Sequence, residues 1–318
     1  MARFVTVTLN PALDLSTAVD EIVDAHKLRC ETPQVHPGGG GINVARVLYR
    51  LGADVLTIST AGGTTGERLS ALVRAEGLHA AWISIAGDTR ESFNVRERRT
   101  GREYRFVLPG PSLAATEWQG CLDRVRDLPS APAYLVASGS LPPGVPSDFH
   151  ARLARIARIR GSKMVIDAGG EALQAALAEG VWAIKPSLRE LQDLTGRPLD
   201  TLSQRLDAAR DLIARGRTEL VALSLGPAGA LAVSAQQAVQ AVQAPALKVP
   251  VVGTVGAGDS FVAGWLWGWD RYGHLDGALR EAMAASAAAL LRPGTDLARV
   301  KDLERLRPQV QLEAVVPS

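Results

Sequence analysis

The sequence predicts an α/β protein with a doubly wound, mostly parallel β-sheet and helices on both faces of it. Three observations lead to this fold class. Short β-branched runs, such as FVTVTL at 4–9, alternate with helical patterns along most of the chain. Two glycine-rich turns, at 38–41 and 253–258, each run into a helical pattern. The length of 318 residues suits one large domain of this kind or two smaller ones.

The strands and helices are expected in a regular order. The first strand, 4–9, ends at Asn10-Pro11 and leaves Asp14 in a loop. The glycines at 38–41 open a helix that Gly52 ends. The alternation then predicts these elements: strand 55–59, helix 67–76, strand 78–85, helix 116–127, strand 134–137, helix 148–160, strand 164–167, helix 171–178, strand 181–184, helices 188–194 and 202–214, strand 220–225, short antiparallel edge strands at 230–233 and 239–242, and a long helical region after 253–260 that includes 279–291, followed by a polar tail.

Residues 90–108 break this alternation. Apolar and polar residues alternate on both sides of Thr100-Gly101, which is typical of a β-hairpin. We expect the hairpin to pair with 27–35 and to form a small lid outside the main sheet, made from about 12–36 and 88–109. A flap of two or three strands is marginally stable unless its apolar face is covered, so the pattern also predicts a homodimer that forms through the lid.

Composition excludes several broad classes. The chain has 35 basic and 33 acidic residues, a net charge of +2, so no global charge points to nucleic acid or to an anionic membrane. Cys30 and Cys121 are too few for a disulfide framework or a thiolate metal site. The N-terminus enters a strand pattern at once, and no apolar run is long enough to span a bilayer. We therefore expect a cytoplasmic protein.

The helix that begins within 253–260 is the expected chemical centre. Its sequence, GTVGAGDS, places three glycines in six residues before a helical pattern. The first turn of a helix has backbone N–H groups without partners and the positive end of the helix dipole, which together favour a bound anion. Asp259 in this turn would repel that anion, but it is placed to take a proton from a hydroxyl that attacks a phosphate. The alternative is structural, with an acid that only stabilises the helix dipole.

Other enzyme classes lack their motifs. The chain has neither GxxxxGK[ST] nor a GxGxxG turn after the first strand, which argues against P-loop and nicotinamide enzymes. Ser140 lies in SGSLPPG at 138–144, which is not the GxSxG elbow of hydrolases. The histidines lack metal-ligand spacing and occur at 26, 36, 79, 150 and 274.

Arginines are concentrated in the predicted hairpin. Glutamates alternate with them, as expected for the solvated face of a ribbon rather than for a nucleic-acid site. Arg90, just before the hairpin, and Lys27 with Arg29 in the other lid segment are better placed to hold a small anion.

Six motifs together resemble the ribokinase-like, PfkB-type carbohydrate kinases, and they occur in order over essentially the whole chain. They are TLNPALD at 8–14, PGGGGINVAR at 37–46, SGSLPPG at 138–144, KPSLRE at 185–190, SLGPAGA at 224–230 and GTVGAGDS at 253–260. The resemblance implies one ribokinase-like kinase domain over 1–318, with the β-lid described above.

Within the family, four segments are most similar to the minor-type bacterial 6-phosphofructokinases. They are KLRC at 27–30, the run of glycines at 38–41, EYRFVLPG at 103–110 and GEALQAALA at 170–178. The 1-phosphofructokinases and tagatose-6-phosphate kinases share TLNP and GAGD, but they usually read GGKG or GKG at the glycine run. They are the alternatives.

The resemblance implies a role for each residue on the sugar side of the site. Asp259 would be the general base on the C1 hydroxyl, and the amides of Gly256, Ala257 and Gly258 would form the anion hole for the transferring phosphoryl group. Residues that would bind sugar hydroxyls or border the sugar are Asp14, Gly39, Gly40, Asn43 and Ser140. Residues that would hold the 6-phosphate are Arg90, Lys27 and Arg29.

On the nucleotide side, the resemblance implies that Lys185 contacts phosphate and that Glu190 orders Mg²⁺ through water. Ser224, Gly226 and Gly229 would line the ATP channel. The family usually has Asn at the position of Ser187, so a shorter hydroxyl stands where an amide is expected. A potassium site at the backbone of Val255 and Gly294 is also implied.

The expected activity is ATP- and Mg²⁺-dependent phosphorylation of fructose 6-phosphate to fructose 1,6-bisphosphate. The partners are then a small phosphosugar and ATP, without nucleic acid or membrane. A non-catalytic sugar-phosphate sensor on the same fold is the alternative from another class, although intact Asp259, Lys185 and Glu190 argue against it.

Overall fold

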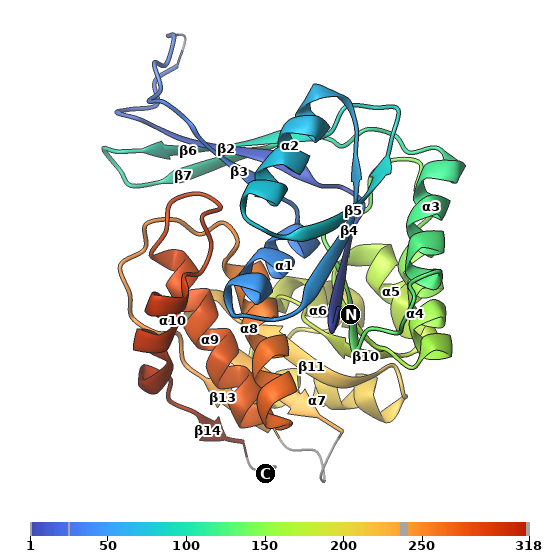
Figure 1. Cartoon of the computed structure of the whole chain (residues 1–318). Coiled ribbons are helices and arrows are strands. Elements are labelled where there is room, and N and C mark those ends of the chain that lie inside the picture. The colour runs from blue at the N-terminus through green and yellow to red at the C-terminus, as the bar shows by residue number, and fades with distance from the viewer. Residues whose placement is uncertain (1, 25, 236–240, 316–318) are drawn as a thin grey trace.

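A ten-stranded sheet forms the centre of the molecule (Figure 1). The computed structural model describes residues 2–24, 26–235 and 241–315. In spatial order, the strands are β14 (Glu313–Ala314), β13 (Ala241–Ala244), β12 (Ala230–Ser234), β11 (Thr218–Ser224), β10 (Val181–Ile184), β9 (Lys163–Asp167), β8 (Tyr134–Ser138), β1 (Phe4–Thr8), β4 (Val55–Ala61) and β5 (His79–Ser84).

The strands from β5 to β11 are parallel to one another, and β12, β13 and β14 add an antiparallel edge. All five residues of β1 are buried, as expected for a parallel strand that is covered on both faces. This arrangement confirms the predicted α/β class with a mostly parallel sheet. The expected edge strand 239–242 corresponds to β13, but residues 239 and 240 lie outside the described part of the chain.

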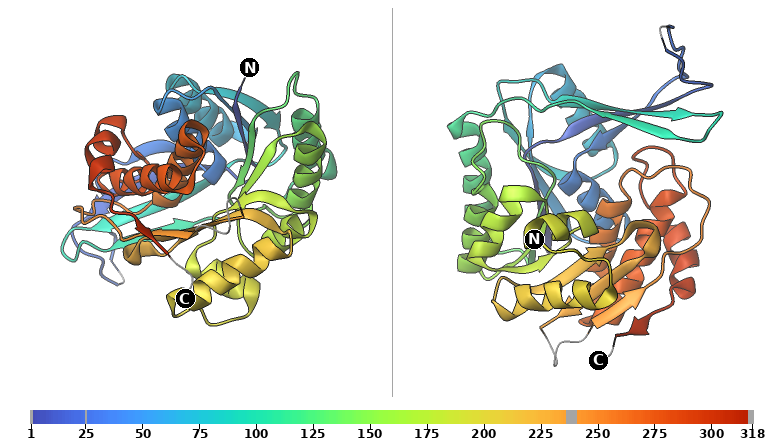
Figure 2. Two further views of the ribbon diagram at one scale, coloured as in Figure 1. Left: turned by 90° about the horizontal axis from the view of Figure 1, so that it is seen from below. Right: turned by 180° about the vertical axis from the view of Figure 1, so that it is seen from behind.

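Helices cover both faces of this sheet (Figure 2, left). One face carries α1 (Gly40–Arg50), α2 (Gly63–Ala75), α8 (Ala257–Tyr272), α9 (Leu275–Leu290) and α10 (Val300–Leu306). The other face carries α3 (Ala115–Arg126), α4 (Phe149–Arg160), α5 (Gly170–Glu179), α6 (Leu188–Thr195) and α7 (Leu202–Ala214). Alternate residues of a strand enter opposite cores, so Phe4 packs on the first face and Val5 on the second.

The helix pair α8 and α9 is closely packed, and this fixes the position of the α8 N-terminus. A Cβ atom at Gly264 would lie 2.5 Å from the carbonyl oxygen of Glu281, and one at Gly268 would lie 2.9 Å from that of Gly277. Only glycine permits this approach, and the alanines of α9 present a similarly small surface to it. The first turn of α8 is therefore held on a rigid element.

A second, four-stranded sheet lies outside the first, in the order β3 (Gln34–Gly38), β2 (Ala12–Val19), β6 (Arg90–Glu97) and β7 (Glu103–Val107). Strands β6 and β7 form the expected hairpin and extend beyond the body of the molecule (Figure 2, right). The predicted pairing of this hairpin with 27–35 was wrong. The hairpin pairs in parallel with β2, and β3 pairs with the other edge of β2. Asp14 therefore lies in a strand and not in a loop, because the turn at Asn10-Pro11 leads directly into β2.

The C-terminal region is more ordered than the expected polar tail. It contains α10, a 3₁₀ turn at Arg307–Gln309 and β14, which pairs with β13. Leu303 and Leu306 of α10 are buried against the helices of the first face. Among the described residues, no helix is long and apolar enough to cross a membrane.

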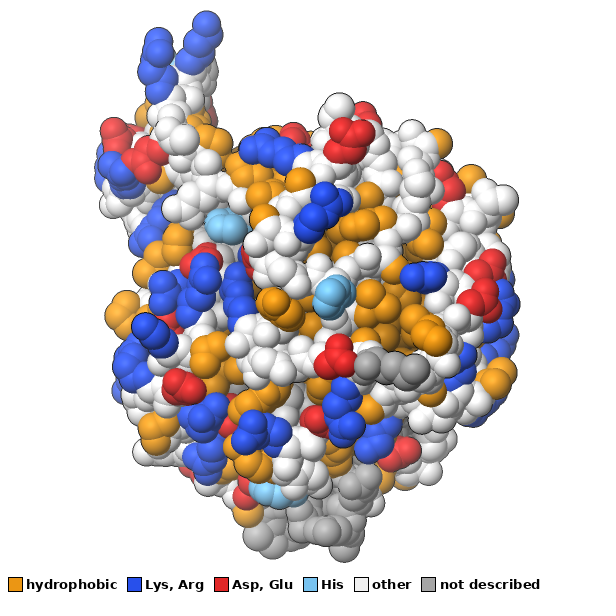
Figure 3. All heavy atoms as spheres, viewed as in Figure 1, with side chains coloured by type: hydrophobic (Ala, Val, Ile, Leu, Met, Phe, Trp, Pro, Cys, Tyr) orange, Lys and Arg blue, Asp and Glu red, His pale blue; other side chains and the backbone are white. Residues whose placement is uncertain are grey.

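Charged side chains of both signs are mixed on the face of the molecule that Figure 3 shows. Basic and acidic groups adjoin one another in several places on this face, with apolar atoms between the clusters. This distribution is in keeping with the small net charge of +2.

Candidate active site

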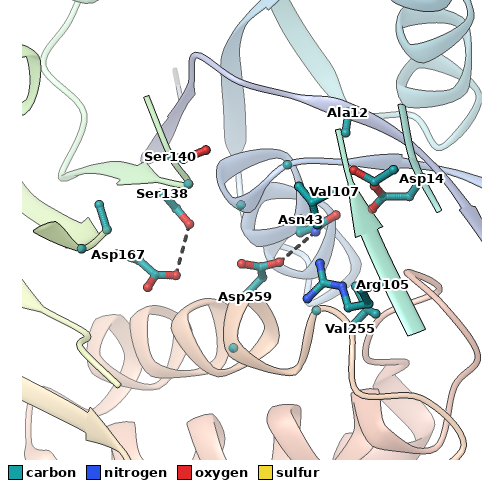
Figure 4. A pocket seen from close by; sticks show the side chains of 18 of the residues that line it. Ala12, Asp14, Asn43, Arg105, Val107, Ser138, Ser140, Asp167, Val255 and Asp259 are labelled. Carbon is teal, nitrogen blue, oxygen red and sulfur yellow. Dashed lines mark hydrogen bonds between the residues drawn. The ribbon is translucent and has the colours of Figure 1, made fainter. Parts of the chain in front are cut away.

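A cavity of about 650 Å³ separates the carboxyl ends of the central strands from the four-stranded sheet (Figure 4). The structure brings many of the predicted residues together in its wall. These are Asp14, Gly39, Gly40, Asn43, Arg90, Ser140, Lys185, Glu190, Val255, Gly256, Gly258 and Asp259. They come from segments that are far apart in the sequence, and carboxyl ends of parallel strands are the usual place for a ligand in this class of fold.

The N-terminus of α8 points into the cavity. Gly256 precedes the helix with a φ of 76°, in the left-handed region that favours glycine, and a Cβ atom there would lie 2.2 Å from Leu297 Cδ2. In the part of the chain that the structure describes, no side chain caps this helix. The first N–H groups of α8, including those of Ala257 and Gly258, are thus available to an anion.

Asp259 lies in the first turn of α8 and is partly exposed, to the cavity that it lines. Its Oδ2 accepts a hydrogen bond of 2.8 Å from Asn43 Nδ2. Burial raises the pKa of Asp259 to about 7, and the negative charge of Asp167 adds to this effect, whereas the Asn43 hydrogen bond and the charge of Lys185 oppose it. A carboxylate with a pKa near neutral is suited to accept a proton.

Lys185 and Asp167 form a buried ion pair beside Asp259. Lys185 Nζ lies 2.9 Å from Asp167 Oδ1, and Ser138 Oγ donates to Asp167 Oδ2 over 3.2 Å. Burial alone would lower the pKa of Lys185, but the charge and hydrogen bond of Asp167 outweigh it and the pKa is raised. Lys185 therefore stays a cation next to the positive end of α8, where it favours a bound phosphate.

The opposite end of the cavity carries Asp14, Arg90 and Arg105. Arg90 Nη2 donates to the carbonyl of Asn10 and Nη1 to that of Leu108, both over 3.1 Å, so its guanidinium is held in place. Burial raises the pKa of Asp14, while the charges of Arg105 and Arg90 oppose this. The close approach of the Asp14 carboxylate explains the first glycine of the run, because a Cβ atom at Gly38 would lie 2.2 Å from it.

The four-stranded sheet is attached to the turn that leads into α8. Glu103 Oε2 accepts hydrogen bonds from the backbone N and the Oγ1 of Thr254, over 3.1 and 2.8 Å. Arg96 Nη1 donates to the carbonyl of Val252 over 2.9 Å. Strands β6 and β7 thus contact the backbone just before the glycine turn.

Lys27 and Arg29 do not lie in the cavity wall of their own chain. They are exposed, in the segment between β2 and β3, whose described residues form no regular strand. This segment projects from the molecule at the upper left of Figure 1.

Six further predicted residues are outside the cavity wall but close to it in the fold or sequence. They are Ala257, Ser187, Ser224, Gly226, Gly229 and Gly294. Ser187 and Ser224 bridge the ends of β10 and β11, and Gly226 and Gly229 belong to the turn that follows β11.

Ser187 has a structural role that the sequence reading did not include. It is the N-cap of α6, where its Oγ accepts from the backbone N of Glu190 over 3.3 Å, and its own N donates to Glu190 Oε2 over 2.6 Å. This reciprocal capping box fixes the carboxylate of Glu190 at the cavity wall.

The donor set suits a magnesium ion that keeps most of its water. Asp167 and Glu190 place carboxylate oxygens, which Mg²⁺ prefers, in the wall near Lys185. Over the ranges that the structure describes, no group of three or more His, Cys, Asp or Glu side chains is arranged to hold a metal. A metal there would depend on substrate phosphates for further ligands.

The sequence reading missed Asp167, Ser138 and Arg105. A signal for the first two was present, since each ends a strand at the carboxyl edge of the sheet, as Lys185 does after β10. Arg105 gave no such signal, because it is one of several arginines in the hairpin and only the fold shows that it faces the cavity.

Comparison with known proteins places the chain among sugar kinases. Residues 7–302 match the pfkB family carbohydrate kinases. ATP-dependent 6-phosphofructokinase isozyme 2 of Mycobacterium tuberculosis is 44% identical over 303 residues, which are 95% of this chain and 88% of that protein. The 1-phosphofructokinase of Vibrio cholerae is 33% identical over 316 residues, 99% of this chain and 98% of that protein.

A solved structure gives the same fold. The crystal structure of phosphofructokinase-2 from Escherichia coli in complex with potassium superposes with a TM-score of 0.91 and 37% sequence identity, covering 97% of this chain and 99% of that one. The ribokinase-like arrangement expected from the motifs is thereby confirmed.

Proposed function

The chain belongs to the pfkB family of carbohydrate kinases, and we propose that it transfers the γ-phosphoryl group of ATP to the C1 hydroxyl of fructose 6-phosphate, giving fructose 1,6-bisphosphate. One observation carries the proposal. Asp259, with a pKa of about 7, lies in the uncapped first turn of α8, between the cation of Lys185 and the arginines at the other end of the cavity. Base, anion hole and two phosphate-binding regions are then in one cavity.

The chemistry is an in-line displacement. Asp259 accepts the proton of the C1 hydroxyl as its oxygen forms a bond to the γ-phosphorus, and the bond from that phosphorus to the β,γ-bridging oxygen breaks, so that ADP leaves with the electron pair. The amides of Gly256, Ala257 and Gly258 stabilise negative charge on the transferring group. Loss of one comparable donor costs about 3 kcal/mol of transition-state stabilisation in other enzymes.

ATP binds along the ends of β10 and β11. Lys185 contacts its phosphates, and Ser187, Ser224, Gly226 and Gly229 line the channel near this position. Glu190 and Asp167 are the residues that would hold Mg²⁺, which would supply positive charge to neutralise the phosphates. Potassium binds at the backbone of Val255 and Gly294, a proposal that the potassium complex of the E. coli relative supports.

The sugar phosphate binds on the other side of Asp259. Asp14, Asn43, Gly39, Gly40 and Ser140 contact the sugar, and Arg90 holds the 6-phosphate with Arg105 nearby. The four-stranded sheet acts as the lid that excludes water from the reaction. The protein works in the cytoplasm as a homodimer joined through this lid, in which Lys27 and Arg29 reach a phosphate site only from a second copy of the chain or after the projection moves.

Two other functions are the alternatives to this proposal, and an assay can distinguish them. A 1-phosphofructokinase or tagatose-6-phosphate kinase would use the same base and anion hole, and the Vibrio cholerae relative favours the first of these. A non-catalytic sugar-phosphate sensor would bind the sugar without releasing ADP.

The deciding assay measures ADP release with fructose 6-phosphate, fructose 1-phosphate, tagatose 6-phosphate and unphosphorylated sugars. We expect the highest kcat/KM with fructose 6-phosphate. Asp259→Asn should bind ATP as the wild type does and lower kcat by at least about 10²-fold, the low end of acid–base contributions. A higher kcat/KM with another phosphosugar would mean that this other phosphosugar is the substrate. Absence of ADP release with every sugar would favour a non-catalytic sensor.

A further inference from the structure

Arg46 is a fully buried arginine in α1, directly behind the candidate active site, and no role is given to it above. It is 1% exposed and is the largest of the fully buried side chains of the described residues. A guanidinium keeps its charge in proteins, so burial on this scale requires partners for its donors. One of those partners is a side chain of the cavity wall.

Arg46 links its surroundings to one side chain of the cavity wall. Nε and Nη2 donate to the carboxylate of Glu76 over 2.6 to 3.0 Å, and Nη1 donates to the carbonyls of Pro37 and Thr295, each over 2.9 Å. Nη1 also donates to Asn43 Oδ1 over 3.3 Å. Asn43 lies three residues earlier in α1, on the same face of the helix.

These contacts determine which way the Asn43 amide faces. An amide has an oxygen that only accepts and a nitrogen that only donates. Arg46 offers only donors, so it selects the Asn43 oxygen and turns the nitrogen away from itself. That nitrogen donates to Asp259 Oδ2 over 2.8 Å. With the amide reversed, two donors would face each other at Arg46 and two acceptors at Asp259.

We propose that Arg46 is a positioning residue for the catalytic base: it orients Asn43 so that the amide donates to Asp259 and holds that carboxylate in its ionised, proton-accepting form. This inference rests on the proposed kinase function. It adds a residue that touches neither the substrate nor Asp259 and that acts only through Asn43. The pKa of Asp259 supports it, since the Asn43 hydrogen bond lowers a value that burial raises.

Other charged groups surround this network and also act on Asp259 or Arg46. Asp167, Lys185 and Asp14 face Asp259 from the carboxyl end of β9, the end of β10 and β2. Around Arg46 and Glu76 lie Arg50 of the same helix, His36 of β3, and Asp296 and Arg299 from the loop after α9. Of these groups the test changes Arg50, as a control, and Glu76 only if Arg46→Lys does not fold.

The experiment compares the pH dependence of kcat/KM for the wild type, Arg46→Lys and Arg50→Lys. Arg46→Lys keeps the positive charge, but one amine cannot replace the planar fork that serves Glu76, two carbonyls and Asn43 together. We expect its acidic limb to move to higher pH by about one unit, the size of effect expected when one hydrogen bond to a carboxylate is lost, with activity that recovers at alkaline pH.

Arg50→Lys is the matched control. Arg50 lies in the same helix and also contacts Glu76, over 3.2 Å, but its other hydrogen bonds go to the carbonyls of Asp296 and Ala298. The acidic limb of the Arg50→Lys pH profile should lie at the same pH as that of the wild type. This should hold even if the melting temperature of Arg50→Lys falls as much as that of Arg46→Lys. An Arg46→Lys enzyme that is less stable but has an unmoved limb would mean that Arg46 is only structural, and the proposal would be overturned.

Asn43→Ala decides whether the effect passes through the amide. It should move the limb in the same direction, and adding Arg46→Lys to it should move the limb no further. Additive shifts would contradict the proposed path. If Arg46→Lys does not fold, Glu76→Gln replaces it, with a smaller shift in the same direction expected and no shift counting against the proposal. A wild type that has no kinase activity would instead refute the proposed function.

Discussion

At Asp259, the proposed role as a base requires the ionised carboxylate, whereas folding favours the protonated form. Burial raises the pKa of this carboxyl from its ordinary value of 3.8 to about 7 in the folded protein. Between about pH 4 and pH 7 the folded state keeps a proton that the unfolded state has released. The stability contributed by this group is therefore full below its unfolded pKa and is lost as the pH rises through the folded pKa.

The Asp259→Asn variant should consequently be more stable than the wild type above pH 7. A shift of about three pKa units corresponds to up to about 4 kcal/mol at pH 8, and the difference should shrink toward pH 5. Thermal or denaturant unfolding followed by circular dichroism at the two pH values measures it. Asp193→Asn, a change at an exposed side chain, is the control and should alter neither value by more than about 0.5 kcal/mol. A variant that is less stable than the wild type at pH 8 would contradict the expectation.

Arg90 should contribute to sugar-phosphate binding and not to ATP binding. Its guanidinium lines the cavity and is held by the carbonyls of Asn10 and Leu108. We expect Arg90→Ala to raise the KM for the phosphosugar about tenfold or more, since hydrogen bonds to charged groups are worth about 1.5 to 3 kcal/mol. The KM for ATP should change much less. Arg99→Ala, at the exposed end of the hairpin, should leave both values near wild type, and an unchanged sugar KM in Arg90→Ala would remove Arg90 from the phosphate site.

At the scale of single elements, helices α6 and α8 begin in different ways. The first turn of α6 is closed by the capping box of Ser187 and Glu190. That of α8 is open among the described residues, and the open one faces the cavity. Orphan N–H groups are normally satisfied by a cap or by a ligand. The difference is the reason to assign the anion site to α8 and a supporting role to α6.

The capping box predicts how substitutions at position 187 behave. Ser187→Asn keeps a good N-cap and should leave the free energy of unfolding within about 0.5 kcal/mol of wild type, with the Mg²⁺ dependence of the reaction unchanged. Ser187→Ala should cost about 1 kcal/mol, because the backbone N of Glu190 loses its acceptor, and should change the Mg²⁺ requirement little, because the backbone N of residue 187 still donates to the Glu190 carboxylate. Chemical denaturation and a Mg²⁺ titration of the rate measure both effects. If Ser187→Ala were as stable as the wild type but unable to use ATP, the hydroxyl would act on the nucleotide directly.

At the scale of the whole molecule, the four-stranded sheet leaves apolar side chains uncovered along one strand. Phe106 and Val107 of β7 and Leu108, the residue after it, are exposed at 54%, 56% and 43%. Lys27 and Arg29 are exposed, between β2 and β3 of the same sheet, and do not line the cavity of their own chain. A second copy that covers the apolar strand would also bring these cations toward a phosphate site.

Mixing two inactive variants tests this arrangement. Subunits with Asp259→Asn and subunits with Lys27→Ala and Arg29→Ala should regain activity when co-expressed, up to roughly a quarter of wild type, because half of the random dimers are mixed and each has one complete site. Asp259→Asn mixed with Arg90→Ala is the control, and its activity should not exceed that of the Arg90→Ala subunits it contains, since both residues line the cavity of one chain. No recovery in the first mixture, or a stable active monomer in sedimentation, would refute a site shared through the lid.

Much of the fold and of the catalytic turn followed from local patterns. The alternation of strand and helix predicted the parallel sheet, because a parallel strand is apolar throughout and each helix shows its own period. The turn at 253–260 and Asp259 were predicted from the local chemistry of a glycine-rich helix start, whereas Lys185 and Glu190 were predicted only from the family resemblance. Asp14 and the partner of the hairpin were misplaced, since pairing in a mixed sheet depends on contacts between distant segments.

The sequence by itself thus determined the class of fold and the family, and it predicted the residues proposed to act as base and to bind the anion. Only the tertiary structure decided which charged side chains lie close to one another. It placed Asp167 and Lys185 beside Asp259, brought Arg105 into the cavity and Arg46 behind it, and left Lys27 and Arg29 outside. The physical reason is that a pKa or a hydrogen bond depends on distance and burial in space, and neither is written in the spacing of residues along the chain.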